Sequence, residues 1–184
     1  MTYYGAKELA DSFRTVRRNT IQIAQDIPEA KYTFRATPET LTVAEELAHI
    51  ACATLWHVQA HATDKKTFIS FEDFGAYMGR TGDEEKKLTT KAAILQALDS
   101  NGEAFANFLE GLTTEQLGER VSFPPPVQPS SKTRFEMLLS AKEHEMHHRG
   151  KLMLVERLIG VVPHLTRARQ ERMQAAGAGA ESGR

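Results

Sequence analysis

Residues 133–159 have the apolar spacing of one long helix, and two histidines lie in the middle of its apolar stripe. His144 and His148 are four residues apart, so they are neighbours on one face of that helix. Two buried imidazoles need polar partners at the same depth, and a single metal ion would be a partner for both. On a helical wheel the stripe spans roughly 80° and consists of Met137, Ala141, His144, His148, Leu152, Val155 and Ile159.

Three more segments carry helical periodicity, and no convincing strand accompanies them. Residues 6–27, 42–61 and 90–110 repeat apolar residues at helical spacing. A further short helix is allowed around 71–78, and residues 111–131 contain prolines that no helix tolerates. Four long helices joined by long links predict an all-α fold, a four-helix bundle with long crossover connections.

The length of 184 residues favours one domain with its own core. We assign residues 1–165 to a single helical-bundle domain. Residues 166–184 form a short basic segment followed by a small-residue C-terminal tail, which we expect to be disordered.

Composition and charge argue against several classes of partner, although a local charged patch stays open. The formal net charge is −1, so electrostatics gives no support to binding of nucleic acid or an acidic membrane. No apolar run is long enough to span a membrane, and the first residues lack the apolar core of a signal peptide. Cys52 is the only cysteine, which excludes an intrachain disulfide. We therefore expect a cytoplasmic protein with no nucleic-acid partner and no membrane partner.

A third ligand for a metal at His144 and His148 must come from another helix, and His49 is the best candidate. It lies in the apolar helix predicted over 42–61, close to Trp56 on the helical wheel. Three histidines leave coordination positions open for water or substrate, in contrast to a closed structural zinc site. Imidazole suits zinc, nickel, iron and copper, so the ligand set does not select the metal.

The remaining histidines have weaker claims as ligands. His57 and His61 are also four residues apart, but His61 lies beside charged residues at the helix end, so we expect a partly solvated pair. His147 points about 60° away from His144. We expect it at the edge of the pocket or bonded to a carboxylate. His164 follows a proline and is expected to be exposed.

Two metalloprotein motifs overlap these residues. Residues 144–148 fit the H-E-x-x-H pattern of zincin metalloproteases, with Glu145 as the general base. The longer metzincin pattern would need a histidine where Leu154 stands, and no strand is predicted to bind a peptide. Residues 46–49 and 145–148 also fit the two E-x-x-H motifs of di-iron bundles. That site would also require a glutamate from each remaining helix, Glu103 and the poorly placed Glu8. His144 would have no role in it.

The pattern as a whole resembles the DinB/YfiT-like family. The resemblance rests on His49 within residues 45–51 (E-E-L-A-H-I-A) and on residues 144–150 (H-E-M-H-H-R-G), about 95 residues further along the chain. It extends over roughly residues 5–162. One departure is Lys151, where the family commonly has glutamine after Arg-Gly.

The resemblance implies a metal held by His49, His144 and His148 in a bundle with crossover connections, and often a homodimer. Family members with known activity are mostly thiol-dependent transferases or isomerases that use a low-molecular-weight thiol such as bacillithiol, mycothiol or glutathione. Zinc or nickel is the expected divalent metal, and iron is an alternative. Glu145 and Arg149 lie off the histidine stripe and either contact the metal ligands or another helix, or form part of a solvated or salt-bridged face.

We therefore expect a metal-dependent enzyme that acts on an electrophilic small molecule through a three-histidine site. Trp56 and His147 are the candidate substrate-binding residues, and the pattern assigns no catalytic residue. Two alternatives stay open: a non-catalytic metal-binding or stress-related protein of the same fold, and a metal-dependent hydrolase that uses His144, Glu145 and His148.

Overall fold

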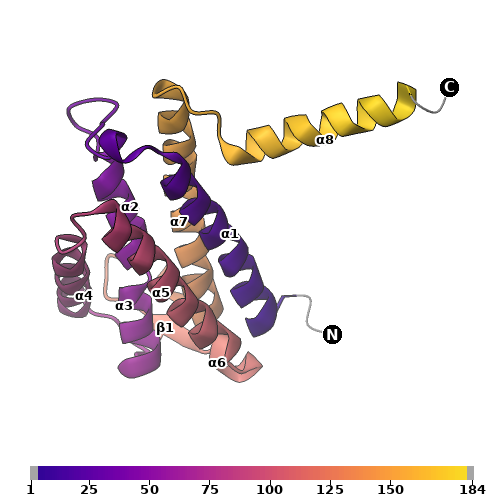
Figure 1. The fold of residues 1–184 in the computed structure, drawn as a ribbon. Coiled ribbons are helices and arrows are strands. Elements are labelled where there is room, and N and C mark those ends of the chain that lie inside the picture. The colour runs from indigo at the N-terminus through magenta and orange to yellow at the C-terminus, as the bar shows by residue number, and fades with distance from the viewer. Residues whose placement is uncertain (1–3, 182–184) are drawn as a thin grey trace.

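Four helices form the bundle in the computed structural model, which describes residues 4–181, and the side chains of residues 4–176. The helices are α1 (Ala6–Asp26), α2 (Val43–Cys52), α5 (Lys91–Glu110) and α7 (Arg134–Leu158). Helices α1 and α2 each contact both α5 and α7. Helices α2 and α5 run in the same direction, because the chain returns between them through α4 (Phe71–Glu85), which packs outside α2 (Figure 1). The predicted four-helix bundle with crossover connections is confirmed.

Local sequence signals set the helix starts. Thr42 accepts a hydrogen bond from the backbone amide of Glu45, whose carboxylate in turn accepts from the amide of Thr42. Thr133 and Glu136 form the same reciprocal pair at the start of α7. These capping boxes satisfy amides that the first helical turn leaves without partners.

Two apolar clusters fill the bundle, one above the other. A buried ion pair between Arg17 of α1 and Glu145 of α7 lies, by position along these helices, between the two clusters. One cluster is built around Ile23, Leu47, Ile50, Ile94, Leu98 and Leu152, and the other around Leu9, Phe13, Phe105, Leu109, Leu138 and Ala141.

The prediction of one continuous helix over residues 42–61 is wrong. Helix α2 ends at Cys52 and is followed by α3 (Leu55–Val58) and a π-helical turn, η2 (Gln59–Thr63). The break frees two carbonyls of α2, and side chains from other helices bond to them. Arg17 Nη2 donates to the Ile50 carbonyl at 3.2 Å, and Asn101 Nδ2 donates to the Ala51 carbonyl at 3.1 Å. Both donors are distant in sequence, so the local apolar pattern carries no sign of the break.

Strands are present, contrary to expectation. After α6 (Thr114–Gly118), β1 (Arg120–Ser122) pairs antiparallel with β2 (Ser131–Thr133), which leads directly into α7. The prolines lie in the turn between the two strands and not inside them. Each strand has three residues, too few for alternation to be visible in the sequence. A short 3-10 helix, η1 (Glu29–Lys31), lies in the first connection, and α4 extends past the predicted residues 71–78.

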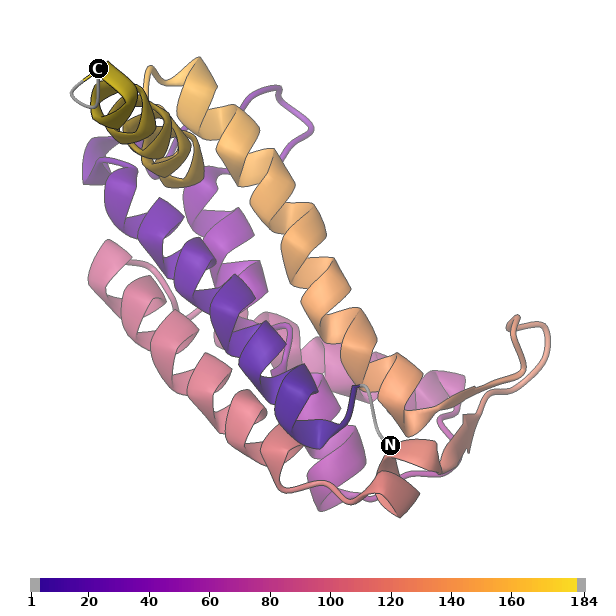
Figure 2. The same ribbon diagram turned by 90° about the vertical axis from the view of Figure 1, so that its right-hand side faces the viewer.

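Helix α8 (His164–Glu181) extends away from the end of the bundle (Figure 1) and points toward the viewer when the molecule is turned by 90° (Figure 2). The predicted short basic segment is helical, and the helix continues to Glu181 in a segment rich in alanine, where the sequence predicted a disordered tail. Residues 182–184 of the predicted tail lie outside the described residues. No helix in the described part of the chain is long and apolar enough to cross a membrane.

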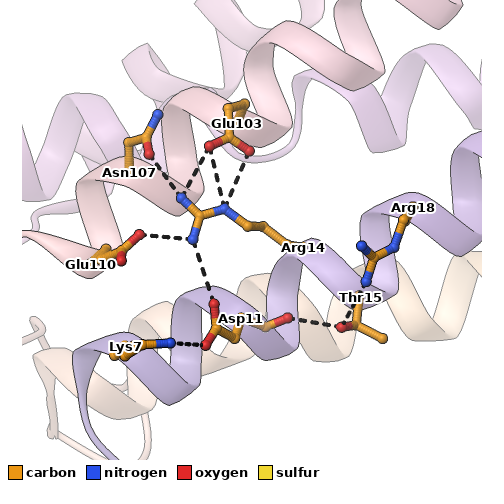
Figure 3. Close-up of polar contacts among 8 residues, drawn as sticks. All are labelled: Lys7, Asp11, Arg14, Thr15, Arg18, Glu103, Asn107 and Glu110. Carbon is orange, nitrogen blue, oxygen red and sulfur yellow. Dashed lines mark hydrogen bonds and ion pairs between the residues drawn. The ribbon is translucent and has the colours of Figure 1, made fainter.

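A polar network on the surface joins α1 to α5 (Figure 3). Arg14 contacts Glu103 and Glu110 at 3.0 and 2.8 Å, and its Nη2 donates to Asn107. Glu103 therefore faces solvent and Arg14, while Glu8 caps the amide of Gly5 at the start of α1. Neither carboxylate faces the histidines, so the di-iron arrangement is not formed.

Candidate metal centre

Three imidazoles from two helices converge inside the bundle. His49 lies on α2, and His144 and His148 lie one turn apart on α7. The Nε2 atom of His144 is 3.1 Å from Nε2 of His49 and 3.0 Å from Nε2 of His148. Two ligands held about 2.1 Å from one ion, at angles between about 90° and 109°, are themselves about 3.0–3.4 Å apart. These two distances are therefore those of ligands to one ion, and the ligand atoms of all three histidines lie within 4.8 Å of one another.

Two carboxylates fix the orientation of the imidazoles of His49 and His148, the two neighbours of His144. Glu85 of α4 lies 2.9 Å from Nδ1 of His49, and Glu46 of α2 lies 2.7 Å from Nδ1 of His148. An ionised carboxylate only accepts, so each Nδ1 carries the proton, and a neutral ring then presents a lone pair at Nε2. Carboxylates in this position are typical of histidines that bind metals.

The three facing nitrogens do not satisfy one another. His144 has one Nε2 hydrogen at most, so it donates to only one of its two neighbours. At least one lone pair is left facing the others in the interior, where an unmatched polar atom is costly. A divalent cation at the centre of the three nitrogens would resolve this mismatch, so the donor set fits a metal.

The protonation states suit a metal ligand set. Burial lowers the pKa of His144 to about 4, and the neighbouring His148 and His49 act in the same direction, so His144 is neutral at pH 7. Burial on its own would raise the pKa of Glu46, but the hydrogen bond from His148 and the positive charge of Lys151 outweigh it, and the pKa falls below its usual value. Lys151, the departure from the family pattern, lies 3.6 Å from this carboxylate.

A cavity of about 490 Å³ opens beside the histidines, and we call it the metal cavity. His49 and His144 line it, whereas His148 is buried behind them. An ion at the cluster would therefore have free coordination positions on the cavity side, which is the arrangement of catalytic sites. The rest of the lining is mostly apolar and comprises Ala53, Trp56, His57, Phe74, Met78, Thr81, Gly82, Glu85, Ser140 and Ala141.

The two candidate substrate-binding residues lie in different places. Trp56 lines the metal cavity, together with Phe74, whose ring lies edge-on to it at 5.8 Å. His147 is exposed and does not line this cavity. Its ring meets His148 edge-on, with the centroids 5.2 Å apart, on the outer side of α7. Trp56 is therefore within reach of a molecule in the metal cavity and His147 is not, and the substrate-binding role of both stays a prediction.

The expectation of a partly solvated His57–His61 pair is wrong. Their exposed fractions are 3% and 4%, and Nδ1 of His61 is 2.7 Å from Nη1 of the buried Arg134. Burial lowers the pKa of both rings: that of His61 falls to about 4, with a smaller contribution from Arg134. The break after α2 and the turn at η2 change the direction of these side chains, which a continuous helix would not do. His164, expected to be exposed, is half-buried and contacts Asn19.

Glu145 does not face the histidine cluster. Its carboxylate pairs with Arg17 at 2.9 Å, and both side chains are almost fully buried. This is the interhelical contact that the sequence left open, and it excludes the placement that a zincin general base requires. Arg149 is half-buried at the next turn of α7. Within the described residues, His49, His144 and His148 are the one group of three or more ligand-type side chains with metal-binding spacing.

Glu46 and Glu85 were missed as partners of the histidines. Glu46 had a weak signal, because it lies three residues before His49 in a buried helix. Glu85 had none, because α4 reaches His49 only through the packing of α4 on α2.

Comparison with known proteins gives a family and a fold. A family model described as the DinB superfamily matches residues 12–152. A DinB-like protein from Bacillus subtilis is 23% identical, with a TM-score of 0.59, and the match covers 83% of this chain and 92% of that one. An uncharacterized protein from Clostridium difficile is 16% identical, with a TM-score of 0.64 and coverage of 86% and 99%.

A third similar structure is YfiT from Bacillus subtilis, described as a probable metal-dependent hydrolase with an unusual four-helix bundle topology. It is 14% identical, with a TM-score of 0.64, and the match covers 88% of this chain and 91% of YfiT. At these identities the three structures support the fold alone. Among curated proteins, none matches the chain.

Proposed function

The chain belongs to the DinB superfamily, and from this premise we propose that it is a metal-dependent enzyme whose divalent ion is held by His49, His144 and His148. One observation carries the proposal: Nε2 of His144 lies 3.0–3.1 Å from Nε2 of the other two histidines, with all three ligand atoms within 4.8 Å of one another, beside an open cavity. Glu46 and Glu85 hold the outer two rings so that their lone pairs face inward. Zinc and nickel are the first candidates, and iron is the next.

The reaction we propose is transfer of a low-molecular-weight thiol to an electrophilic small molecule, or an isomerisation that uses such a thiol. The three histidines would hold a divalent ion, and that ion would supply the Lewis acidity that lowers the pKa of a thiol or a water. In the transfer the thiol sulfur forms a bond to the electrophilic carbon, the leaving group departs with its bonding pair, and the thiol proton passes to solvent. The apolar lining of the metal cavity supports an organic substrate.

A second candidate is a metal-dependent hydrolase, the activity given in the description of YfiT. Glu145 would not be its general base, because the carboxylate is bound to Arg17. Water would then have to lose its proton to another group. A third candidate is a non-catalytic metal-binding or stress-related protein, for which removal of the ion should unfold the chain.

Metal analysis of the untagged protein tests the ligand set. We expect one equivalent of bound ion per chain after incubation with zinc or nickel, and less than a tenth of an equivalent in a His144→Ala variant. His147→Ala is the matched control, because His147 is the exposed neighbour on the same helix. Stoichiometric metal in His144→Ala, or none in the wild type, would overturn the assignment.

Activity assays separate the reaction classes. Glutathione and other small thiols would be tested with monochlorobimane, and hydrolysis with p-nitrophenyl acetate. Thiol conjugation that disappears with a chelator, with the fold intact by circular dichroism, supports the transferase. Chelator-sensitive ester hydrolysis without conjugation supports the hydrolase. The family resemblance also implies a homodimer, which light scattering of the purified chain would test.

A further inference from the structure

A second cavity lies next to the metal cavity and shares a wall with it. We call it the apolar pocket; its volume is about 280 Å³. Trp56 and Phe74 line both cavities, and their rings meet edge-on with centroids 5.8 Å apart. The other lining residues come from the start of α4, from the turn after β1 and from α7: Ile69, Ser70, Phe71, Phe123, Pro124, Val127 and Met137.

The lining of the apolar pocket gives a charged group no partner. It contains no ionisable side chain, and its one hydroxyl, on Ser70, is occupied in capping α4 through Asp73. A charged or strongly polar occupant would lose its hydration without compensation. The volume suits a ring or a short alkyl chain, since pockets for complete drug-sized ligands are about 300–1,000 Å³.

The mouth of the apolar pocket exposes aromatic rings. Phe71 is 61% exposed and Phe74 is 46% exposed, both at the start of α4. Phe13 and Phe105, by contrast, are fully buried in the bundle. Adjacent exposed aromatic rings at the rim of a cavity are typical of binding sites, because a bound group covers their apolar surface.

The metal cavity supplies a polar group beside the shared wall. His57 packs against Trp56, with the ring planes tilted by 33° and the centroids 3.7 Å apart, and lines the metal cavity. Its Nδ1 is buried without a partner, and neither ring nitrogen makes a hydrogen bond to a described residue. A buried imidazole without partners is unusual. A polar molecule in the metal cavity can fill that need.

We propose that the apolar pocket binds an uncharged aromatic or aliphatic arm of the substrate while the reactive, polar end lies in the metal cavity. The substrate class is then a small amphipathic molecule with its reactive carbon close to an apolar group. This inference rests on the proposed function for the position of the reactive end. The pocket itself depends only on Trp56, Phe74 and the residues around them.

The fluorescence of Trp56 can be used to measure ligand binding. This residue is the only tryptophan of the chain and lies in the shared wall, so its fluorescence responds to occupants of both cavities. The zinc-loaded wild type would be titrated with ethanethiol and with benzyl mercaptan, and binding checked by calorimetry. We expect benzyl mercaptan to bind at least about tenfold more tightly, because its ring buries apolar surface in the pocket. Equal affinities for the two thiols would overturn the proposal.

A variant that fills the apolar pocket tests whether the tighter binding of benzyl mercaptan comes from that pocket. Val127→Phe places a ring in the apolar pocket from its half-buried loop position, and the gain for benzyl mercaptan should fall below twofold. Leu154→Phe adds the same group at an exposed site on α7, 58% exposed, and should keep the full gain. A gain that survives in Val127→Phe would place the ring elsewhere and overturn the proposal. Should that variant misfold, Phe71→Ser, at the exposed mouth, should reduce the gain about threefold.

A binding experiment without metal tests this inference separately from the proposed function. Benzyl alcohol would be titrated against the chelator-treated protein and the same variants. If the wild type binds no zinc, the proposed metal function fails. Binding of benzyl alcohol that is lost in Val127→Phe and kept in Leu154→Phe would still support the apolar pocket. Absence of benzyl alcohol binding to the wild type would overturn the pocket whatever the result with zinc.

Discussion

Arg17 of α1 and Glu145 of α7 meet in the interior of the bundle, with Nη2 and Oε2 2.9 Å apart. The same guanidinium donates to the carbonyl of Leu98 on α5 at 2.7 Å and to that of Ile50 on α2 at 3.2 Å. One side chain therefore bonds to each of the other three bundle helices. It is the polar layer between the two apolar clusters.

Arg17→Met should lower the free energy of unfolding by about 3–5 kcal/mol, because the carboxylate of Glu145 is left charged and unpaired in the interior. Urea denaturation followed by circular dichroism measures the loss. The matched control is Arg18→Met at the exposed neighbouring position, which should change the unfolding free energy by less than about 0.5 kcal/mol. A loss below about 1 kcal/mol in Arg17→Met would contradict the role given to the pair.

Gly102→Ala should destabilise the protein although alanine is the better helix former. A Cβ at this position of α5 would lie 2.8 Å from Cγ of Arg17, whose head group is fixed by its bonds to Glu145 and Leu98. We expect a loss of about 1–3 kcal/mol. Gly79→Ala in α4 meets nothing within 4 Å and should stabilise by about 0.5–1 kcal/mol. Thermal melts of both variants measure the change in stability relative to the wild type. A change of the same sign in both variants would contradict the prediction.

Glu46→Ala should weaken metal binding by about 10- to 100-fold, since it removes the carboxylate that orients His148 and leaves all three histidines in place. Competition with a chromogenic chelator measures the affinity. Glu84→Ala is the control, because Glu84 is exposed and pairs with Lys87. Unchanged affinity in Glu46→Ala would show that His148 does not depend on this carboxylate.

Glu156 should make stability depend on pH. The side chain of Glu156 is fully buried on α7, its carboxylate has no partner among the described residues, and burial together with Asp26 raises its pKa to about 7. The unfolded chain ionises near the usual value of 4.5, whereas the folded chain keeps the proton until about pH 7. Stability from this group is therefore complete below pH 4.5 and is lost as the pH rises to 7.

Glu156→Gln removes this dependence. The difference in unfolding free energy between wild type and variant should shift in favour of the variant from pH 4.5 to pH 8, by up to about 3 kcal/mol. Urea titrations of both proteins at the two pH values give the difference directly. A shift in the opposite direction would mean that the carboxylate has a positive partner in solution.

The bundle was predictable because helical apolar spacing persists through four long segments. The break in the second helix was not, since the donors that satisfy the freed carbonyls of Ile50 and Ala51, Arg17 and Asn101, come from other helices. Side-chain donors distant in sequence leave no trace in a local pattern. The two short strands were hidden for a different reason, which is that three residues are too few to show alternation.

The histidine cluster was predictable in part. His144 and His148 stand out because polar residues interrupt an apolar stripe, and His49 because it lies in a second buried helix. That the three rings lie within contact of one another is a result of α2–α7 packing. The partner carboxylates follow from the same packing, so their roles could only be read from the structure.

Two adjacent residues of α7 point in different directions: His144 faces the metal cavity, and Glu145 faces Arg17. Successive residues of a helix point about 100° apart. The bond to Arg17 thus sets the angular position of α7, and any rotation of the helix would withdraw both histidines from His49. Folding preorganises the three imidazoles, so an ion that binds them would need little further ordering of its ligands.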